Sequence, residues 1–377
     1  LKLNAGRCSA TRRNGLSGRR QVMPCFRPRV WYVAAIVSCC AVARSEESGT
    51  DSTCSATEKC SPSQREPEQL CTAKASDRSF ARLCEWLANE CNGVAEGTEN
   101  VFLGTFDHGG VLVRGLGAAR DFEENEFVFC IPKHCWMTRG YEDVRVKQMA
   151  MGIEACGKQE KLVLHLAEEK RKGNASFHAP YIAWMPTREE LSQFHPAYLT
   201  GVELPEPLSY WKDWSENLRA CHKTYSAVAR LRGREPPTWE DVYEAMVLVT
   251  TRTFAETDLV PLADTANTEP LEKHNVRQTW QSDAQDGMCL NTLRAVAAGE
   301  ELMLDYGAES HSAMTMFLTY GFTLPAGHHD PEGHDLGDGM KPSDVCQLLQ
   351  SVQFPDEPST RSAVAQRYRD FATQHCA

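Results

Sequence analysis

The stretch Leu302-Met303-Leu304-Asp305-Tyr306-Gly307, preceded by Ala298-Gly299-Glu300-Glu301, predicts a strand that ends at a tyrosine. Because a glycine follows Tyr306, the tyrosine hydroxyl is expected at the exit of a sheet. A core tyrosine with a hydrated tip is the common alternative for such a residue. A short helix is expected next, over residues 310–320, and it stops at Gly321.

Arg252, Asp264 and Asn267 form a second group of polar residues, upstream of this strand. They lie in or just after the segments Thr250-Thr251-Arg252-Thr253-Phe254 and Leu259-Val260-Pro261-Leu262-Ala263-Asp264. Three polar side chains beside a strongly apolar strand are compatible with a binding site. A solvated loop with one ion pair explains the same pattern, and the residues taken alone favour it.

Arg114-Gly115-Leu116-Gly117 is a third candidate segment, and it lies between two strand signals. Glycines at these positions would let backbone N–H groups approach a ligand closely. Most such glycine pairs form turns, which is the alternative interpretation. The segment lacks the strand-to-helix setting and the third glycine of a dinucleotide-binding fingerprint.

The periodicity of the rest of the chain predicts an α+β domain whose strands are interrupted by a helical insertion. Apolar side chains at helical spacing predict a helix that begins near Ser79 and ends before Asn92-Gly93. A helical pattern also spans residues 137–257. The expected strands are 101–103, 111–113, 127–129, 259–262, 276–280, 288–293 and 302–306.

Taken in order, these segments resemble the SET domain, in the branch of the Rubisco large-subunit methyltransferase and the related actin-histidine methyltransferase. The resemblance spans residues 79–325 and includes Cys84-Glu85-Trp86-Leu87, Ile131-Pro132 with Met137-Thr138, Pro180-Tyr181 with Met185-Pro186, and Tyr320-Gly321-Phe322. It implies an α+β, SET-type, β-rich fold with a knot-like crossing and a helical insertion between two halves.

The resemblance also implies S-adenosyl-L-methionine as cofactor, a protein as substrate, and Tyr306 as the catalytic residue. The positions that match cofactor contacts are Arg114, Gly115, Leu116, Arg252, Asn267 and Thr268, and those that match substrate contacts are Arg252, Phe254, Asp264, Tyr306 and Tyr320. A lysine acceptor has a pKa of about 10.4 and attacks only when it is deprotonated. An aromatic channel of Tyr181, Phe254, Tyr306 and Tyr320 would desolvate it and lower that pKa. This chemistry requires no metal.

The implied activity is methyl transfer to a lysine side chain, with histidine as the second choice of acceptor. The sequence departs from the family pattern at Thr268, which stands where the family usually has a histidine. Weaker cofactor binding is therefore expected, and Thr268→His is expected to tighten it if the pocket has the space. The family's large C-terminal helical domain is reduced to residues 326–377. A catalytically inactive SET-like module that binds a protein partner is the alternative function.

The charge distribution favours a protein substrate over a nucleic acid. Residues 1–44 carry nine Lys or Arg and no acid, whereas the rest of the chain carries 31 basic and 51 acidic side chains. A body this acidic lacks the basic face that phosphate binding needs. We expect a monomer.

The 16 cysteines include no Cys-x-x-Cys pair, so no metal site is predicted. The cluster from Cys54 to Cys91 is interpreted as free thiols. Disulfides are the alternative, in a secreted protein.

Residues 23–43 have the layout of a secretory signal peptide. Arg27 and Arg29 precede an apolar run over residues 31–43 that ends in Ala-Val-Ala and is too short to span a bilayer. We expect this segment to direct targeting and to be removed, which leaves no stable membrane span. The destination is the secretory route or a plastid reached by a bipartite presequence; cytoplasm or nucleus is the alternative if the N-terminus is an artefact of gene prediction. The predicted division is a leader (1–44), a linker (45–78), two SET halves (79–136 and 246–325) around a helical insertion (137–245), and a loop with a short helical tail (326–377).

Overall fold

The computed structural model describes residues 78–91, 97–108, 111–138, 153, 156–198, 209–255, 257–281, 287–307, 311–324, 342–351 and 360–375. All of them belong to the unit Gln64–Ala377. The signal-like segment, the linker up to residue 77 and residues 325–341 of the loop lie outside the described residues. None of the described helices has the length and apolar character needed to cross a membrane.

The described strands form small antiparallel sheets. β1 (Val101–His108) pairs with β2 (Val111–Ala118). β8 (Gly287–Thr292) lies between β3 (Phe127–Pro132) and β7 (Val276–Gln281), and β6 (Asp258–Leu259) lies between β4 (Met137–Thr138) and β5 (Thr253–Phe254). Two of these sheets therefore join strands from before and after the helical insertion, as the predicted α+β SET-type fold requires.

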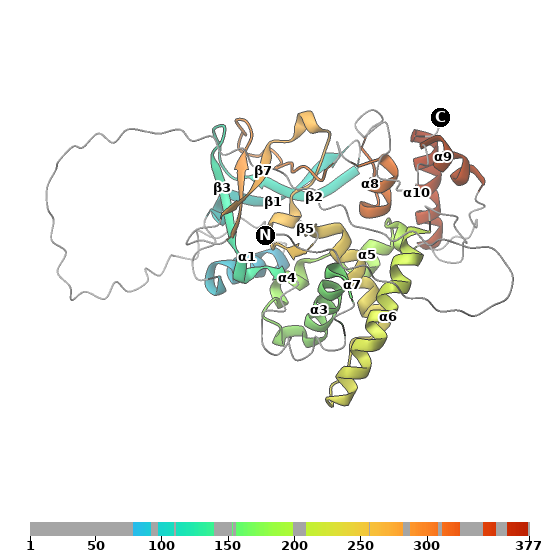
Figure 1. The fold of residues 1–377 in the computed structure, drawn as a ribbon. Helices are drawn as coiled ribbons and strands as arrows, with labels where there is room; N and C mark the ends of the chain where they lie inside the picture. Colours follow the sequence, from blue (N-terminus) through green and yellow to red (C-terminus); the bar gives the residue numbers. More distant parts are fainter. Residues whose placement is uncertain are drawn as a thin grey trace, which may run out of the picture. The chain divides into compact units, whose positions relative to one another are not determined.

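The helices enclose the other side of the unit, with α3, α4, α6 and α7 opposite β1, β2, β3 and β7 in Figure 1. A capping box at Thr238 and Asp241 starts α7, and Gly321 ends α8 at a φ of 80°. The helices are α1 (Arg78–Glu90), α3 (Lys158–Lys172), α4 (Ala179–Trp184), α5 (Arg188–Ser192), α6 (Tyr210–Leu231), α7 (Trp239–Arg252), α8 (Ala313–Tyr320), α9 (Pro342–Ser351) and α10 (Thr360–His375).

Helix α1 confirms the predicted apolar face. Phe80, Leu83, Cys84 and Leu87 are buried, and the Phe80 ring centroid lies 5.1 Å from that of Trp184 in α4. The i, i+3, i+4 and i+7 spacing thus puts one stripe of α1 against the insertion. This contact joins the start of the domain to the helices that follow β4.

Several expectations differ from the structure. The strand expected over 259–262 is limited to β6, and the helical pattern expected over 137–257 contains the short strands β4 and β5. The segment Arg114-Gly115-Leu116-Gly117 lies inside β2, not between strands, because each residue pairs in register with β1. Residues 302–306 do not form a regular strand: Met303 forms one isolated bridge with Asn267, and the preceding Glu301 forms one with Gly117. Leu302 N donates to Leu116 O, and Leu304 N donates to Asn267 O, both at 2.8 Å. The segment therefore hydrogen-bonds both to β2 and to the stretch around Asn267, and it links the two.

The C-terminal tail contains more helix than the expected loop and short helix. Tyr368 of α10 is fully buried, and its ring meets Phe317 of α8 edge-on at a centroid distance of 4.8 Å. Arg367 of the same helix lies over the ring of Phe194. The last helix is therefore packed against the SET half that carries Tyr306.

Three disulfides link described residues that are far apart in sequence. They join Cys91 to Cys135, Cys130 to Cys289, and Cys156 to Cys221. The interpretation of the Cys54–Cys91 cluster as free thiols is wrong for Cys84 and Cys91, which are both disulfide-bonded. The cluster's members from Cys54 to Cys71 lie outside the described residues. The sequence did not reveal the Cys91–Cys135 pair, because the two cysteines are 44 positions apart and follow no recognisable spacing pattern.

His195 makes the fold sensitive to acid. It is fully buried, its Nε2 donates to Thr319 O at 2.9 Å, and its Nδ1 accepts from Ala197 N at 3.2 Å, so the ring is neutral. Burial lowers its pKa to about 4, although the bond to Thr319 opposes the shift. Since the unfolded chain binds this proton more tightly, with a pKa of about 6.5, the stability is complete above that pH and is lost as the pH falls toward 4.

We therefore expect the free energy of unfolding to fall by a few kcal/mol between pH 7 and pH 4.5. The fall should be smaller in His195→Gln, which has no group to protonate there. Denaturant titrations of both proteins at several pH values measure this. Parallel curves for the two proteins would show that His195 is not the sensitive group.

Candidate functional site

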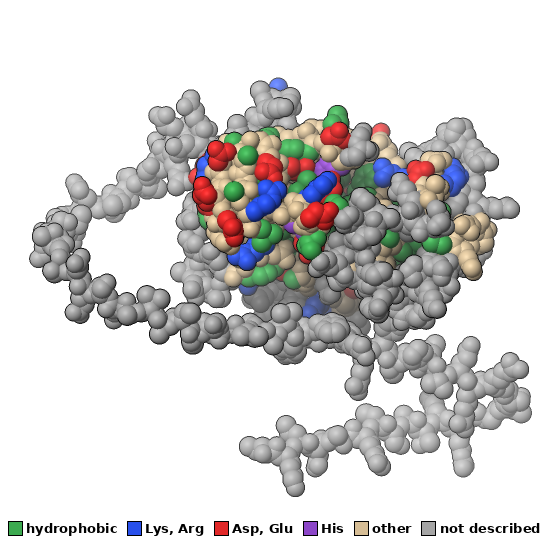
Figure 2. All heavy atoms as spheres, turned by 90° about the horizontal axis from the view of Figure 1, so that it is seen from above, with side chains coloured by type: hydrophobic (Ala, Val, Ile, Leu, Met, Phe, Trp, Pro, Cys, Tyr) green, Lys and Arg blue, Asp and Glu red, His purple; other side chains and the backbone are tan. Residues whose placement is uncertain are grey.

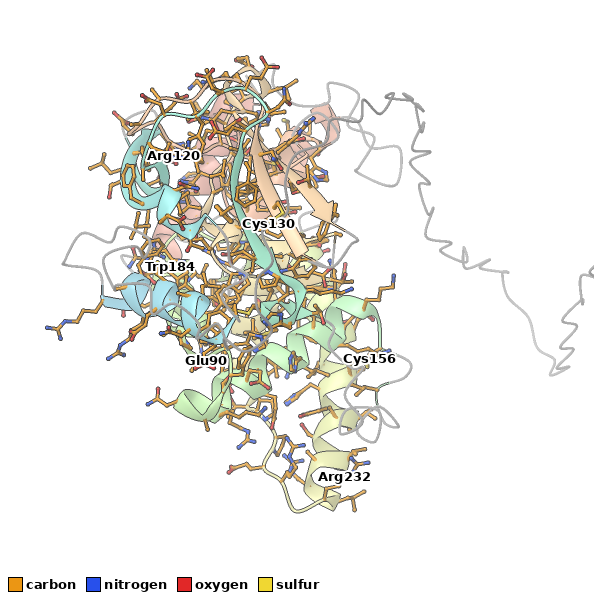
Figure 3. The ribbon with its side chains drawn as sticks, turned by 90° about the vertical axis from the view of Figure 1, so that its left-hand side faces the viewer. Glu90, Arg120, Cys130, Cys156, Trp184 and Arg232 are labelled. Carbon is orange, nitrogen blue, oxygen red and sulfur yellow. A yellow bond between two sulfur atoms is a disulfide. The ribbon has the colours of Figure 1, made fainter. Side chains whose placement is uncertain are left out.

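The middle of β2 forms one wall of the site. The side chain of Leu116 is fully buried and its carbonyl already accepts from Leu302 N, so little of this residue is open to a ligand. The Arg114 carbonyl accepts from Asn267 Nδ2 at 3.0 Å. The Arg114 guanidinium lies 4.0 Å from the ring centroid of Trp184, which Figure 3 labels between the strands and the helices.

Gly115 is required by its neighbours. A Cβ at this position would lie 2.3 Å from Glu301 Oε1 and 2.6 Å from Asn267 Nδ2. The missing side chain allows both polar groups to approach the strand. Gly115 is thus a cradle for Asn267 and Glu301.

Asn267 joins β2 to the segment that follows Gly299. Its Nδ2 donates to Arg114 O and to Glu301 Oε1, at 3.0 and 2.8 Å. Its backbone carbonyl accepts from Leu304 N. The predicted cofactor residues Arg114, Gly115 and Asn267 are therefore brought together.

Glu301 and His108 extend this group, and sequence reasoning missed both. Glu301 is 7% exposed, and burial raises its pKa, although hydrogen bonds from Asn267 and His108 oppose the shift. The two ring nitrogens of His108 lie 2.9 Å from Glu301 Oε2 and 2.8 Å from Glu269 Oε1. The imidazole thus bridges two carboxylates. Glu301 is 193 positions from His108, and no spacing pattern connects them.

Thr268 does not leave room for a larger side chain. It is buried, and its Oγ1 lies 3.2 Å from Nε2 of His274, a ring that also bonds to Glu269 O at 2.7 Å. His274 thus already places an imidazole beside Thr268. The space on which the expected benefit of Thr268→His depended is taken, and this substitution is now expected to disturb packing.

Arg252 and Asp264 form an internal ion pair. Arg252 Nη1 donates to Asp264 Oδ2 at 3.1 Å and to Asp264 O at 3.0 Å, and the Tyr181 hydroxyl donates to Asp264 Oδ2 at 2.8 Å. Burial alone would lower the pKa of Arg252, but the adjacent Asp264 raises it above its usual value. The Asp264 side chain has no exposed surface. Its role in this structure is to hold Arg252, since it does not line an open channel.

Two buried atoms of this pair have no hydrogen-bond partner among the described residues: Arg252 Nε and Asp264 Oδ1. Buried polar atoms are usually paired, so each exception needs an explanation. An unpaired guanidinium donor suits a carboxylate from outside the chain.

Tyr306, Tyr320 and Phe254 are the aromatic residues of the site. The Tyr306 hydroxyl donates to Ala266 O at 2.7 Å, and its ring lies 5.0 Å from that of Tyr320. Burial raises the pKa of Tyr306 well above its ordinary value and that of Tyr320 to about 12, so both hydroxyls are neutral at neutral pH. Phe254 is half-buried in β5 and packs against the core.

The described residues contain a separate group of metal-ligating type: Cys91, His134 and Cys135, whose ligand atoms lie within 4.8 Å of one another. The two cysteines form a disulfide, so their sulfurs are not thiolate ligands. Cys91 lies directly after α1, and His134 and Cys135 lie in the turn before β4, so the group contains none of the candidate site residues.

Comparison with protein families identifies the architecture. The family model of the SET domain matches residues 113–307, which is more than half of the chain. No curated protein matches this chain.

Three solved structures are similar to this chain at low sequence identity. The SET domain of LSMT bound to methyllysine and AdoHcy is 17% identical with a TM-score of 0.53, over 79% of this chain and 90% of that one. The SET domain of LSMT bound to lysine and AdoHcy is 18% identical with a TM-score of 0.49, over 73% of this chain and 65% of that one. Rubisco LSMT bound to AdoMet is 18% identical with a TM-score of 0.49, over 72% of this chain and 64% of that one. This chain therefore spans slightly less than two thirds of the length of these last two structures.

Proposed function

Because the chain belongs to the SET-domain family, we propose that it transfers a methyl group from S-adenosyl-L-methionine to a side-chain nitrogen of a protein, lysine first and histidine second. The observation that carries the proposal is the buried polar cluster around Arg252 and Asn267, directly beside Tyr306. Lysine is put first because one structure of the same fold holds methyllysine with AdoHcy.

The residues of the cluster fit this cofactor. Arg252 has an unpaired buried Nε that would bind the carboxylate of the amino-acid part. Gly115 leaves the backbone of β2 without a side chain, and Asn267 supplies a planar amide beside it. When bound, S-adenosyl-L-methionine supplies a methyl group on a sulfonium cation.

Tyr306 and Tyr320 prepare the acceptor in this proposal. Their raised pKa values keep the phenols neutral, so no phenolate pairs with an incoming ammonium. The Tyr306 hydroxyl donates its proton to Ala266 O, which leaves its oxygen lone pairs to accept from the nitrogen of the substrate. Water exclusion by the two rings lowers the pKa of a lysine amine that enters, and positioning then supplies much of the rate.

The surface seen in Figure 2 carries both signs of charge. Among its described residues, Lys and Arg side chains lie between Asp and Glu side chains. Such a face suits a protein substrate, to which charges of both signs contribute specificity.

Substituting Gly115 tests the cradle. We expect Gly115→Ala to weaken cofactor binding by about tenfold or more, the loss of one hydrogen bond to a charged group, because the new Cβ displaces Asn267 and Glu301. Calorimetric titration with S-adenosyl-L-methionine measures the effect. Gly104→Ala is the matched control: Gly104 pairs with Gly115 across β1 and β2, but the atoms nearest to its Cβ would belong to the rings of Phe102 and Phe106. Equal affinities in the two variants would show that the close approach of Asn267 and Glu301 to Gly115 does not contribute to cofactor binding.

The acceptor is identified by incubating the protein with methyl-labelled donor and a protein extract, followed by mass spectrometry of the labelled chains. The proposal requires label on lysine or histidine. Saturable donor binding without any transfer would favour the inactive partner-binding module.

A further inference from the structure

The side-chain amide of Asn267 has only one orientation that satisfies its neighbours. Its nitrogen faces Arg114 O and Glu301 Oε1, at 3.0 and 2.8 Å. A carbonyl accepts only, and so does an ionised carboxylate, so the NH₂ group must face both. The two N–H bonds are then used, and Oδ1, on the other branch of the planar amide, receives no hydrogen bond from the described residues.

The second carboxylate oxygen of Glu301 is also held by a neighbouring side chain. His108 Nε2 lies 2.9 Å from Glu301 Oε2, and His108 Nδ1 lies 2.8 Å from Glu269 Oε1. Glu269 also pairs with Lys273 at 3.4 Å. Contacts on both oxygens fix the carboxylate plane, and the exposed fraction of Glu301 is only 7%. The loss of side-chain freedom is therefore already complete before any ligand arrives.

We infer that Glu301 is a positioning residue that fixes the polarity of the Asn267 amide, so that Asn267 Oδ1 is presented as a hydrogen-bond acceptor to an N–H group of the bound donor. This inference rests on the proposed function. The recognised chemical group is an amine or ammonium, since an acceptor on the ligand would be repelled by Oδ1. His108 acts on the Asn267 amide only indirectly, because it holds Glu301 in place.

Without Glu301, the orientation of the Asn267 amide is no longer fixed by a second hydrogen-bond acceptor. The Arg114 carbonyl alone still attracts one N–H, but the amide can rotate so that its second N–H faces the ligand. A ligand N–H would then meet a donor. The cost is at least one charge-assisted hydrogen bond, which corresponds to about tenfold or more in the dissociation constant.

A double-mutant cycle separates this role from a merely structural one. The variants are Glu301→Met, which keeps length and volume without an acceptor, Asn267→Ala, and the pair together. Each single variant should raise the dissociation constant for S-adenosyl-L-methionine by about tenfold or more, and the pair should be little worse than Asn267→Ala alone. Multiplicative losses would show that Glu301 acts independently of Asn267 and would overturn the inference.

Glu301→Gln tests the acceptor directly. Its Oε1 can still accept from Asn267, and its NH₂ can donate to His108 Nε2 while His108 Nδ1 donates to Glu269. Affinity within about threefold of wild type is expected, on the scale of half a neutral hydrogen bond. Glu300→Gln is the charge-matched control, because Glu300 pairs with Arg294 and leaves Asn267 untouched.

Thermal midpoints are recorded for all variants, so that a folding defect is recognised. If wild type binds the donor but Glu301→Met binds it equally well, the positioning role is refuted and the proposed function stands. The positioning role is also refuted if Glu301→Gln, still folded, binds no better than Glu301→Met. If wild type binds no donor at all, the proposed function fails, and the inference fails with it.

Discussion

Tyr306→Phe is expected to reduce methyl transfer by about two or more orders of magnitude, the scale of losing a group that acts in the transition state. The hydroxyl bonds to Ala266 O and lies beside Tyr320, where it meets the acceptor nitrogen in the proposed mechanism. Folding should lose only about 0.5–1.5 kcal/mol, one neutral hydrogen bond. Turnover with saturating donor and acceptor, together with a thermal melt, measures both effects.

Tyr243→Phe is the matched control for this substitution. Its hydroxyl also donates to a backbone carbonyl, that of Ala197, and its ring contacts Tyr198 and Trp239, none of which is a candidate site residue. We expect a similar small loss of stability with turnover retained. Full turnover in Tyr306→Phe would exclude Tyr306 as the catalytic residue.

Reduction of the disulfides is expected to lower the thermal midpoint by at least about 10 °C, because each of the three bonds contributes about 2–4 kcal/mol and domains of this size shift by a few degrees per kcal/mol. They close long loops, with sequence separations of 44, 159 and 65 residues. Constraint of the unfolded chain grows with loop length. The Cys130–Cys289 bond should contribute most, since it joins β3 to β8 across the whole insertion; Figure 3 labels Cys130 on β3.

Melts with and without a thiol reductant test this, with alkylation and mass measurement to count the free thiols. A Cys130→Ala, Cys289→Ala double variant should start lower and respond less to reductant. A reductant-insensitive wild-type protein, or six alkylatable thiols at these positions in the untreated protein, would contradict the prediction. Oxidised pairs would agree with the signal-like N-terminus, since disulfides persist in oxidising compartments.

The sequence predicted those parts of the fold that depend on local periodicity. Helix α1 follows from the spacing of Phe80, Leu83 and Leu87, and the end of α8 follows from Gly321. The α+β SET-type class followed from the order of motifs. The pairing of Gly115 with Gly104 did not, because a Gly-x-Gly segment signals a turn as readily as a strand that needs close approach.

Long-range polar partners account for most of what the sequence did not reveal at the site. Arg252 and Asp264 were both singled out, but a largely buried pair is indistinguishable from a solvated one when only residue types are known. Glu301 directly precedes the expected strand 302–306, and His108 falls between the expected strands 101–103 and 111–113, so neither position indicated a site residue. Only the fold brings His108, Glu269 and Glu301 within hydrogen-bond distance. The same applies to His274, which occupies the space beside Thr268.

Titration of the wild-type protein with S-adenosyl-L-methionine in a calorimeter tests the central claim most directly. We expect saturable binding of one donor per chain, weakened in Asn267→Ala and in Arg252→Lys, whose single ammonium cannot replace the Nε donor of a guanidinium. No binding heat and no thermal stabilisation at millimolar donor, with a protein that melts cooperatively, would contradict it.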